Sequence, residues 1–139
     1  MAKGKQPAGN RAEPVIRTIP MPADLNGNGD VFGGWVLSQM DIAGGLIAAR
    51  QAQGRVATVA VEAMTFHRPI YVGDVVSLYG RVSKVGTTSI QVHIETMVER
   101  HDRPDEIKVT EGTFIYVAID ERGRPRPVPK SGVKAGPKG

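Results

Sequence analysis

One carboxylate stands out among the residues that could do chemistry. Asp41 lies within a stretch of apolar and small residues, from Gly33 to Gly45, that has the spacing of a helix. A buried acid without a partner is costly, so a carboxylate retained there has either a structural partner or a functional task. In the structural interpretation, Asp41 caps a neighbouring loop while its helix packs tightly on a sheet. The residue types alone favour neither interpretation.

A second chemical feature is the pair Gly33-Gly34, which follows a loop rich in Asn, Asp and Gly. Two small residues at the start of a helix leave free N–H groups pointing outward, and the helix dipole favours an anion there. The pair could therefore bind a phosphate or an oxyanion. Every helix that begins after a loop offers such donors, so this signal is weak by itself.

Several other kinds of site lack support in the sequence. The chain has no cysteine, which removes thiol nucleophiles, disulfides and cysteine-based metal sites. His67, His93 and His101 do not have the spacing of a metal motif such as H-E-x-x-H. Neither the G-x-S-x-G elbow of serine hydrolases nor a G-x-G-x-x-G dinucleotide fingerprint is present. We therefore expect no metal ion and no separate cofactor.

The element that must position Asp41 is a long helix. Its spacing predicts a start near Phe32 or Gly33 with Asp30 as N-cap, and an end near Gly54. On a helical wheel, small residues surround Asp41, and the broad opposite side is apolar. The small residues are Gly34, Ser38, Gly45 and Ala48; the apolar ones are Val36, Met40, Ile42, Leu46 and Ile47.

The rest of the chain has the two-residue period of strands. Strands are expected over 14–19, 56–66, 75–85, 88–99 and 107–119, joined mostly by short turns. One long helix followed by four strands in antiparallel order predicts an α+β fold in which the sheet wraps around the helix. We expect a single domain over 13–120, with disordered tails over 1–12 and 121–139.

The charge of the chain is concentrated at its ends. The formal net charge is +4, but residues 1–11 and 121–139 together carry +8, so the body between them carries −4. Basic tails can bind nucleic acid or an acidic membrane surface, but short Lys/Gly/Pro tails are more often solvated and disordered. No signal peptide or membrane-spanning run is visible. We therefore expect a cytoplasmic protein that binds neither nucleic acid nor membrane.

Three blocks of sequence carry a more specific signal. They are N-x-N-G-D-V-F-G-G-W-V-L-S-Q-M-D-I-A-G-G (Asn26 to Gly45), V-A-V-E-A-M-T-F-x-R-P-I-x-V-G-D-V-V (Val59 to Val76) and G-x-T-S-I (Gly86 to Ile90). Together they closely resemble the bacterial acyl-CoA thioesterases of the YciA type, in the hotdog-fold superfamily. The resemblance covers about Ile16 to Ile119 and leaves out both tails.

The resemblance implies a fold, an assembly and a reaction. The fold is a hotdog, a curved antiparallel sheet around a central helix. Such chains dimerise by pairing their sheets edge to edge, and this family commonly forms hexamers as trimers of dimers. The reaction is the hydrolysis of acyl-CoA to free fatty acid and coenzyme A, which makes coenzyme A part of the substrate and product.

The resemblance also implies site residues at the dimer interface. The acid at Asp41 is the catalytic carboxylate, acting as general base on water or as nucleophile. Asn26 from the opposite subunit completes the site, and Gly33 and Gly34 supply amides for the oxyanion. Phosphate-binding groups are expected near the mouth, and the candidates are Arg55, Lys84, Thr87 and Thr88.

Two other functions share this fold. A non-catalytic hotdog protein that senses acyl-CoA would not need Asp41, and an appended DNA-binding domain would favour that alternative. A hydratase would normally pair an acid with a histidine near the helix entry, but no histidine lies between Asn26 and Gly54. Both alternatives rank below a thioesterase. The preferred acyl length depends on pocket depth between subunits, which the sequence does not reveal.

Overall fold

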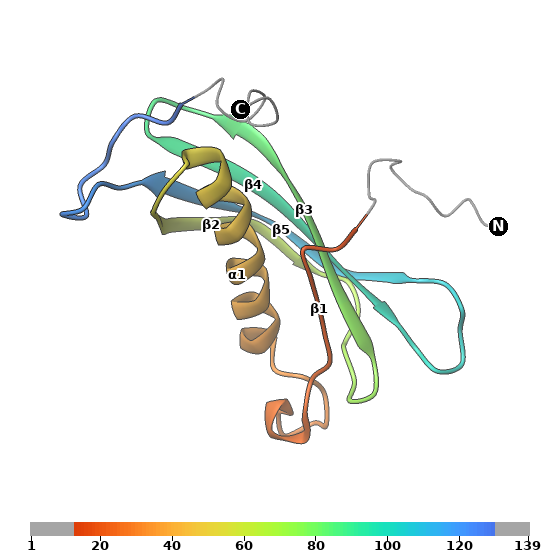
Figure 1. The fold of residues 1–139 in the computed structure, drawn as a ribbon. Coiled ribbons are helices and arrows are strands. Elements are labelled where there is room, and N and C mark those ends of the chain that lie inside the picture. The colour runs from red at the N-terminus through yellow and green to blue at the C-terminus, as the bar shows by residue number, and fades with distance from the viewer. Residues whose placement is uncertain (1–12, 130–139) are drawn as a thin grey trace.

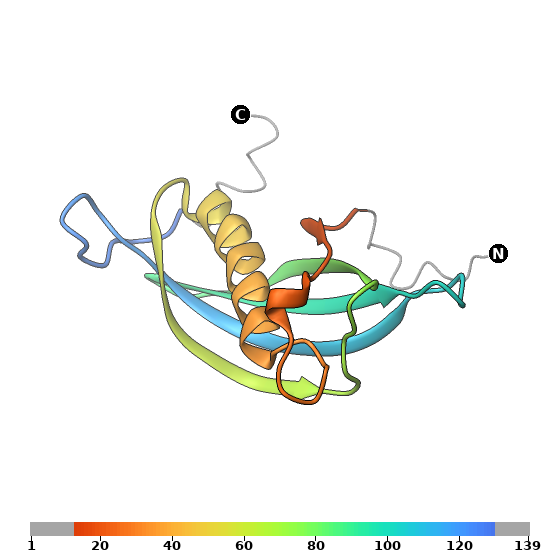
Figure 2. The same ribbon diagram turned by 90° about the horizontal axis from the view of Figure 1, so that it is seen from below.

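The computed structural model describes residues 13–129, which form one long helix wrapped by a five-stranded antiparallel sheet (Figure 1). Seen from below, the helix lies across one face of the curved sheet (Figure 2). The elements in chain order are β1 (Ile16–Thr18), the 3₁₀ turn η1 (Pro22–Asp24), α1 (Gly33–Ala52), β2 (Val56–Phe66), β3 (Val75–Val85), β4 (Ser89–Glu99) and β5 (Ile107–Ala118). The expected fold class is confirmed.

Both ends of α1 differ in detail from the sequence expectation. The N-cap is Phe32, which makes no side-chain cap, rather than Asp30. The backbone N–H and C=O of Asp30 are instead bonded to Asn26 within the preceding loop. At the other end Gln53 adopts the left-handed conformation (φ 56°), one residue before the expected Gly54. The N–H of Gly54 then closes the last turn on the carbonyl of Ala49 at 3.1 Å.

The sheet order is β1-β3-β4-β5-β2, so β2 does not pair with its successor β3. It pairs antiparallel with β5, and the segment 67–74 carries the chain from one side of the sheet to the other. The sequence-based expectation of short connections holds for β3 to β4 and β4 to β5 but not for this step. Within the described part of the chain, β2 is therefore an edge strand with one side unpaired.

A bulge interrupts β2 where it passes the middle of β5. Glu62 pairs with Thr113 and Thr65 with Glu111, so two residues of β2 stand opposite Gly112 alone. The first of them, Ala63, has a positive φ of 53°, which costs energy for a residue with a side chain. A side chain at Gly112 would collide with that of Met64. Gly112 thus gives the bulged strand the space to bend around the helix.

The core lies between α1 and the inner face of the sheet. Along β4, Ile90, Val92 and Ile94 are fully buried, while His93 and Glu95 point to the outer face. The buried positions of α1 include Val36, Met40, Ala43, Gly44 and Ala48. The broad apolar side expected for the helix is only partly covered, because Ile42 and Leu46 remain 52% and 53% exposed. Part of that side is therefore available to a partner.

The packed structure continues past the expected boundary at residue 120. Val128 is buried, and its N–H donates to the carbonyl of Thr87 at 2.8 Å. Arg126 donates to the carbonyl of Ala52 at 2.8 Å and so satisfies the last turn of α1. Residues 126–128 thus pack on the body, whereas 121–125 are exposed. The expected tail over 1–12 and the part of the other tail over 130–139 lie outside the described residues. None of the described helices is long and apolar enough to cross a membrane.

Two threonines that face each other in the core offer a stability test. Among buried side-chain polar atoms of residues 13–129, only Oγ1 of Thr96 has no partner. Thr110, its cross-strand neighbour, donates to the carbonyl of Thr65 at 2.6 Å. We expect Thr96→Val to raise the free energy of unfolding by about 1 kcal/mol, because it removes an unsatisfied buried hydroxyl without changing shape.

The matched control is Thr110→Val, which breaks a hydrogen bond and leaves a carbonyl unsatisfied. It is expected to lower the free energy of unfolding by about 1–3 kcal/mol. Urea denaturation of the two variants checks the pair. Equal losses of stability in both variants would show that the Thr96 hydroxyl has a partner after all.

Candidate active site

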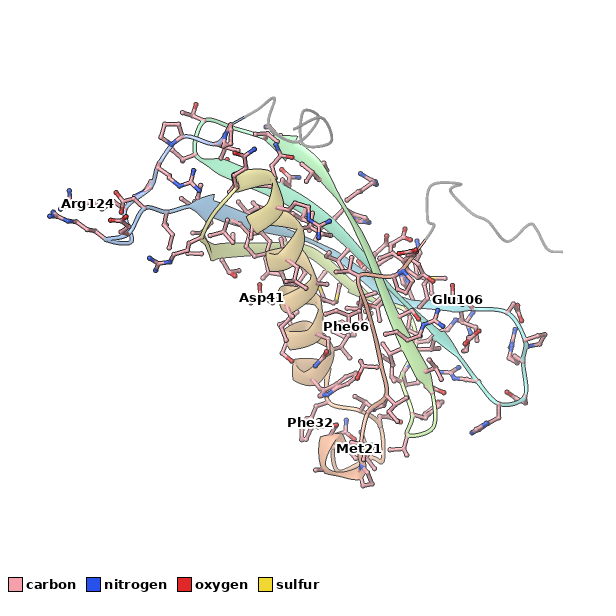
Figure 3. All side chains as sticks on the ribbon, viewed as in Figure 1. Met21, Phe32, Asp41, Phe66, Glu106 and Arg124 are labelled. Carbon is pink, nitrogen blue, oxygen red and sulfur yellow. The ribbon has the colours of Figure 1, made fainter. Side chains whose placement is uncertain are left out.

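Asp41 lies near the middle of α1, on the side facing β2 and β5 (Figure 3). Its Oδ1 atom accepts hydrogen bonds from the hydroxyl of Thr58 on β2 at 2.8 Å and from that of Tyr116 on β5 at 3.0 Å. Oδ2 accepts no hydrogen bond from any residue between 13 and 129. The side chain therefore caps no loop: one oxygen is held by two strands and the other is open to a water molecule.

Tyr116 fixes Asp41 from inside the core. The Tyr116 hydroxyl also lies 3.0 Å from the backbone carbonyl oxygen of Asp41. Burial, reinforced by the hydrogen bond and charge of the Asp41 carboxylate, raises the pKa of Tyr116 far above its ordinary value. The phenol consequently stays protonated and acts as a donor. Gly44 makes this contact possible, because a Cβ there would lie 3.0 Å from Cζ of Tyr116.

Asn26 belongs to the loop that precedes α1. Its side-chain oxygen accepts hydrogen bonds from the N–H groups of Asn28 at 2.8 Å and Asp30 at 3.1 Å. This arrangement holds the loop in a tight turn. The side-chain Nδ2 group of Asn26 meets no acceptor among the described residues. Asn26 thus uses its oxygen for structure and keeps its N–H donors available.

The first turn of α1 supplies further donors. The carbonyl of Phe32 accepts from the N–H groups of Trp35 at 3.0 Å and Val36 at 3.4 Å. The amides of Gly33 and Gly34 find no acceptor within the described part of the chain. A Cβ at Gly34 would meet nothing within 4 Å, whereas one at Gly33 would touch the ring of Phe66 at 3.6 Å. Both amides are thus available as donors, and their use for an oxyanion stays a prediction.

A cleft of about 290 Å³ opens beside this helix start. Its walls combine apolar and polar side chains from the Asn26 loop, the first turn of α1, the segment after β2 and β5. The lining residues are Asn26, Asp30, Val31, Gly33, Val36, Phe66, His67, Arg68, Pro69, Ile70, Val109 and Thr110. Asp41 is not among them.

Within one chain, then, the expected site residues fall into two groups. Asn26 and Gly33 share the cleft. Asp41 is eight residues further along α1 than Gly33 and seven further than Gly34, which is about 10–12 Å at 1.5 Å per residue. A thioester carbonyl bonded to the Gly34 amide would therefore be out of reach of the Asp41 carboxylate in the same chain. The two groups therefore do not form one site within a single chain.

Comparison with known proteins identifies the fold and the family. The profile of the thioesterase superfamily matches residues 28–103. The acyl-CoA thioester hydrolase YciA of Salmonella typhimurium is 54% identical over 125 residues, covering 88% of this chain and 94% of that protein. This chain belongs to the thioesterase superfamily, among relatives of the YciA type. The resemblance inferred from the sequence is thus confirmed.

Solved structures agree with that assignment. The hexameric thioesterase y2039 from Yersinia pestis is 51% identical, with a TM-score of 0.80 over 85% of this chain and 96% of that one. HI0827, a hexameric broad-specificity acyl-coenzyme A thioesterase, is 44% identical, with a TM-score of 0.81 over 91% and 88% of the two chains. The sheet wrapped around α1 is therefore the hotdog fold of this thioesterase superfamily.

Four residues were expected to bind the coenzyme A phosphates. They lie at the other end of the molecule from the Asn26 loop and the cleft. Thr87 and Thr88, in the β3–β4 turn, accept backbone hydrogen bonds from Val128 and Ala118. Arg55 donates to the carbonyls of Asp120 at 3.3 Å and Glu121 at 3.4 Å. Arg55, Thr87 and Thr88 thus all adjoin the segment 118–128. Lys84 is exposed near the end of β3.

The sequence did not indicate several residues near Asp41 and several in the segment 118–128. Thr58 and Tyr116 hold Asp41 from distant strands, and no spacing along the chain connects them with it. At the far end, Arg122 and Arg124 are exposed, and their N–H groups fix the turn through the Asp120 carboxylate at 2.8 and 2.9 Å. Arg122 and Arg124 were not named as candidates because they lie in a segment that was expected to be a disordered tail. The high number of basic residues in that segment could have indicated them.

Proposed function

We propose that this protein hydrolyses acyl-CoA thioesters to a carboxylic acid and coenzyme A, with Asp41 as the group that activates water. The observation that carries the proposal is the hydrogen bonding of Asp41. Thr58 and Tyr116 hold Oδ1, while Oδ2 has no protein partner between residues 13 and 129. Membership of the superfamily and the activities named for YciA and HI0827 support the same reaction.

The complete site requires two copies of the chain. Along the free edge of β2 and the adjoining face of α1, five apolar side chains are 42–56% exposed: Ile42, Leu46, Val59, Val61 and Phe66. A second copy that pairs its own β2 antiparallel would cover them and extend the sheet. Hexamers of the kind named for the y2039 and HI0827 structures would then form from three such dimers.

This pairing explains the separation of the two groups of site residues. Asp41 of one subunit would face the loop and helix start of the other, with Asn26, Gly33 and Gly34 on that partner. A C2 dimer contains two such sites, each built from both chains. The separation of about 10–12 Å within one chain then no longer prevents the two groups from acting together.

The reaction follows from these groups. Asp41 takes a proton from water as the water oxygen attacks the thioester carbonyl. The Gly34 amide donates to the developing oxyanion, and the free Nδ2 group of Asn26 orients the water or the carbonyl. As the carbonyl reforms, the C–S bond breaks and the thiolate of coenzyme A leaves, to be protonated. Direct attack by the carboxylate, with hydrolysis of an anhydride, is the alternative course.

Coenzyme A also carries phosphates, and the candidate binding region for them is formed by the β3–β4 turn and the segment 118–128. Arg55, Thr87 and Thr88 gather there around the segment 118–128, beside the exposed Arg122 and Arg124. These groups can offer guanidinium and hydroxyl donors to phosphate oxygens. We include Lys84 in the same group because of its exposure near the β3–β4 turn.

The interface can be tested by adding a charge to the edge strand. We expect Val59→Lys to weaken the dimer strongly and lower activity, because a buried unpaired ammonium in an apolar interface is costly. Sedimentation velocity across a dilution series measures the effect. The matched control is Val72→Lys, which changes a valine of comparable exposure (46% against 56%) away from β2. Wild-type sedimentation of the Val59 variant would contradict pairing through β2.

The activity itself is tested with a panel of acyl-CoA chain lengths, using a thiol reagent to detect released coenzyme A. A thioesterase releases coenzyme A with turnover, and the panel also reveals the preferred acyl length. A protein that only senses acyl-CoA would bind the same compounds without releasing thiol. Tight binding with no turnover for any chain length would favour that second function and contradict the first.

A further inference from the structure

The outer face of the sheet carries a polar cluster that the proposed reaction does not use. Four ionisable side chains from β4 and β5 take part, and His67 joins them from the residue after β2. We call His67, His93, Glu95, Lys108 and Glu111 the outer-face cluster. The four side chains from β4 and β5 lie opposite α1, since the strand neighbours Val92, Ile94 and Thr110 point into the core. His67 lies at the sheet edge and also lines the cleft beside the start of α1.

The geometry of the cluster centres on Glu111. Nε2 of His93 lies 3.3 Å from Oε1 of Glu111, and Nε2 of His67 lies 3.1 Å from Oε2. Donor atoms of His93, Glu95 and Glu111 all lie within 4.8 Å of one another. All three side chains are half-buried on the rigid β4–β5 pair. An imidazole and two carboxylates therefore converge on one small volume.

These separations suit ligands of a common metal ion. Two ligands bound at 2.0–2.1 Å in tetrahedral geometry are about 3.3–3.4 Å apart. The His93–Glu111 distance matches this value, and Glu95 is near enough to complete a set of three by rotating its carboxylate. His67 then has a separate task, since donation to the second oxygen of Glu111 would orient that ligand.

The ammonium group of Lys108 would compete with a metal ion for the carboxylates of Glu95 and Glu111. Its Nζ atom lies 3.2 Å from Oε2 of Glu95 and 3.4 Å from Oε1 of Glu111. Both carboxylates thus already face a positive charge. The Lys108 side chain is 37% exposed, so its ammonium can move into water when a doubly charged ion takes its place.

We propose that His93, Glu95 and Glu111 form a binding site for a divalent transition metal of the Zn²⁺ type, outside the thioesterase site. One imidazole with two carboxylates is a donor set that such ions accept, and three protein ligands leave a position for water. Motif spacing predicted no metal, because the ligands come from two strands and meet only through the pairing of β4 with β5. This inference does not depend on the proposed hydrolysis.

The test is titration of the tag-free, assembled protein with Zn²⁺ by calorimetry. The titration is simple to interpret, because the chain has only three histidines and no cysteine that could bind Zn²⁺. We expect about one ion per chain. His93→Gln should weaken binding at least tenfold, whereas His101→Gln, which changes an exposed histidine in the β4–β5 turn, should leave it unchanged. Circular dichroism confirms that each variant is folded.

Two further measurements make the outcome decisive. Co²⁺ bound to wild type should give the visible absorption bands of a low-coordinate N/O site, and these bands should be absent in His93→Gln. Lys108→Gln should tighten Zn²⁺ binding, because it removes the competing ammonium. If Zn²⁺ does not bind, or binds equally to wild type and His93→Gln, the outer-face cluster is an ion-pair network only and the metal site is wrong.

Discussion

Replacing Asp41 by asparagine is expected to remove most of kcat while leaving the fold and assembly intact. An amide cannot take a proton from water at neutral pH, so general-base catalysis is lost, typically about 10²–10⁴-fold. The fold should survive because the amide oxygen can still accept from Thr58 and Tyr116, the two hydroxyls that hold Oδ1. Steady-state kinetics with a saturating acyl-CoA measures the loss.

The same variant separates catalysis from structure when its stability is measured as well. If Asp41 served only to join α1 to β2 and β5, the change would lower the melting temperature and leave kcat nearly intact. Thr58→Val is a useful companion, since it removes one donor to the carboxylate and keeps the carboxylate itself. Near-wild-type turnover of Asp41→Asn would overturn the proposed mechanism but not the fold.

The second large effect is expected at Asn26. Asn26→Asp keeps a side-chain oxygen for the N–H groups of Asn28 and Asp30, so the loop should hold its shape. It removes the Nδ2 donor, which the structure leaves without a partner among residues 13–129. We expect kcat to fall by about 10²–10³-fold, the typical cost of losing one donor at a reacting oxygen.

Asn26→Ala is the control for the loop, because it removes the structural oxygen together with the donor. It should lose both activity and local order, which amide hydrogen exchange at Asn28 and Asp30 can follow. The Asp variant should lose activity alone. If Asn26→Asp retained full turnover while Asn26→Ala did not, the role of this residue would be to shape the loop.

Much of the fold was predictable because local patterns coincide with the global structure. The period-2 runs over 56–66 and 75–85 match β2 and β3 residue for residue. The apolar helix around Asp41 was placed to within about two residues. Asp41 could also be singled out from the sequence, because a carboxylate among apolar neighbours is costly wherever a partner is missing; its catalytic role stays a prediction.

The remaining features depend on long-range pairing, which no local pattern encodes. The partners Thr58 and Tyr116 reach Asp41 only because β2 joins the sheet beside β5 rather than beside β3. At the start of α1 the backbone of Asp30 is bonded to Asn26, so Phe32 rather than Asp30 is the N-cap, and at the end Gln53 rather than Gly54 takes the left-handed conformation. The residues for which the sequence predicted joint action proved to lie in separate parts of one chain.

The central claim is that each site combines Asp41 of one subunit with Asn26 of its partner. Mixing the inactive chains Asp41→Asn and Asn26→Asp tests it most directly, after unfolding and refolding them together. With random pairing, a site has both wild-type residues in about a quarter of cases, since each mixed dimer contains one intact and one doubly altered site. We therefore expect the mixture to recover about a quarter of wild-type kcat. Complete inactivity of the mixed oligomers, confirmed as mixed by native mass spectrometry, would contradict a shared site.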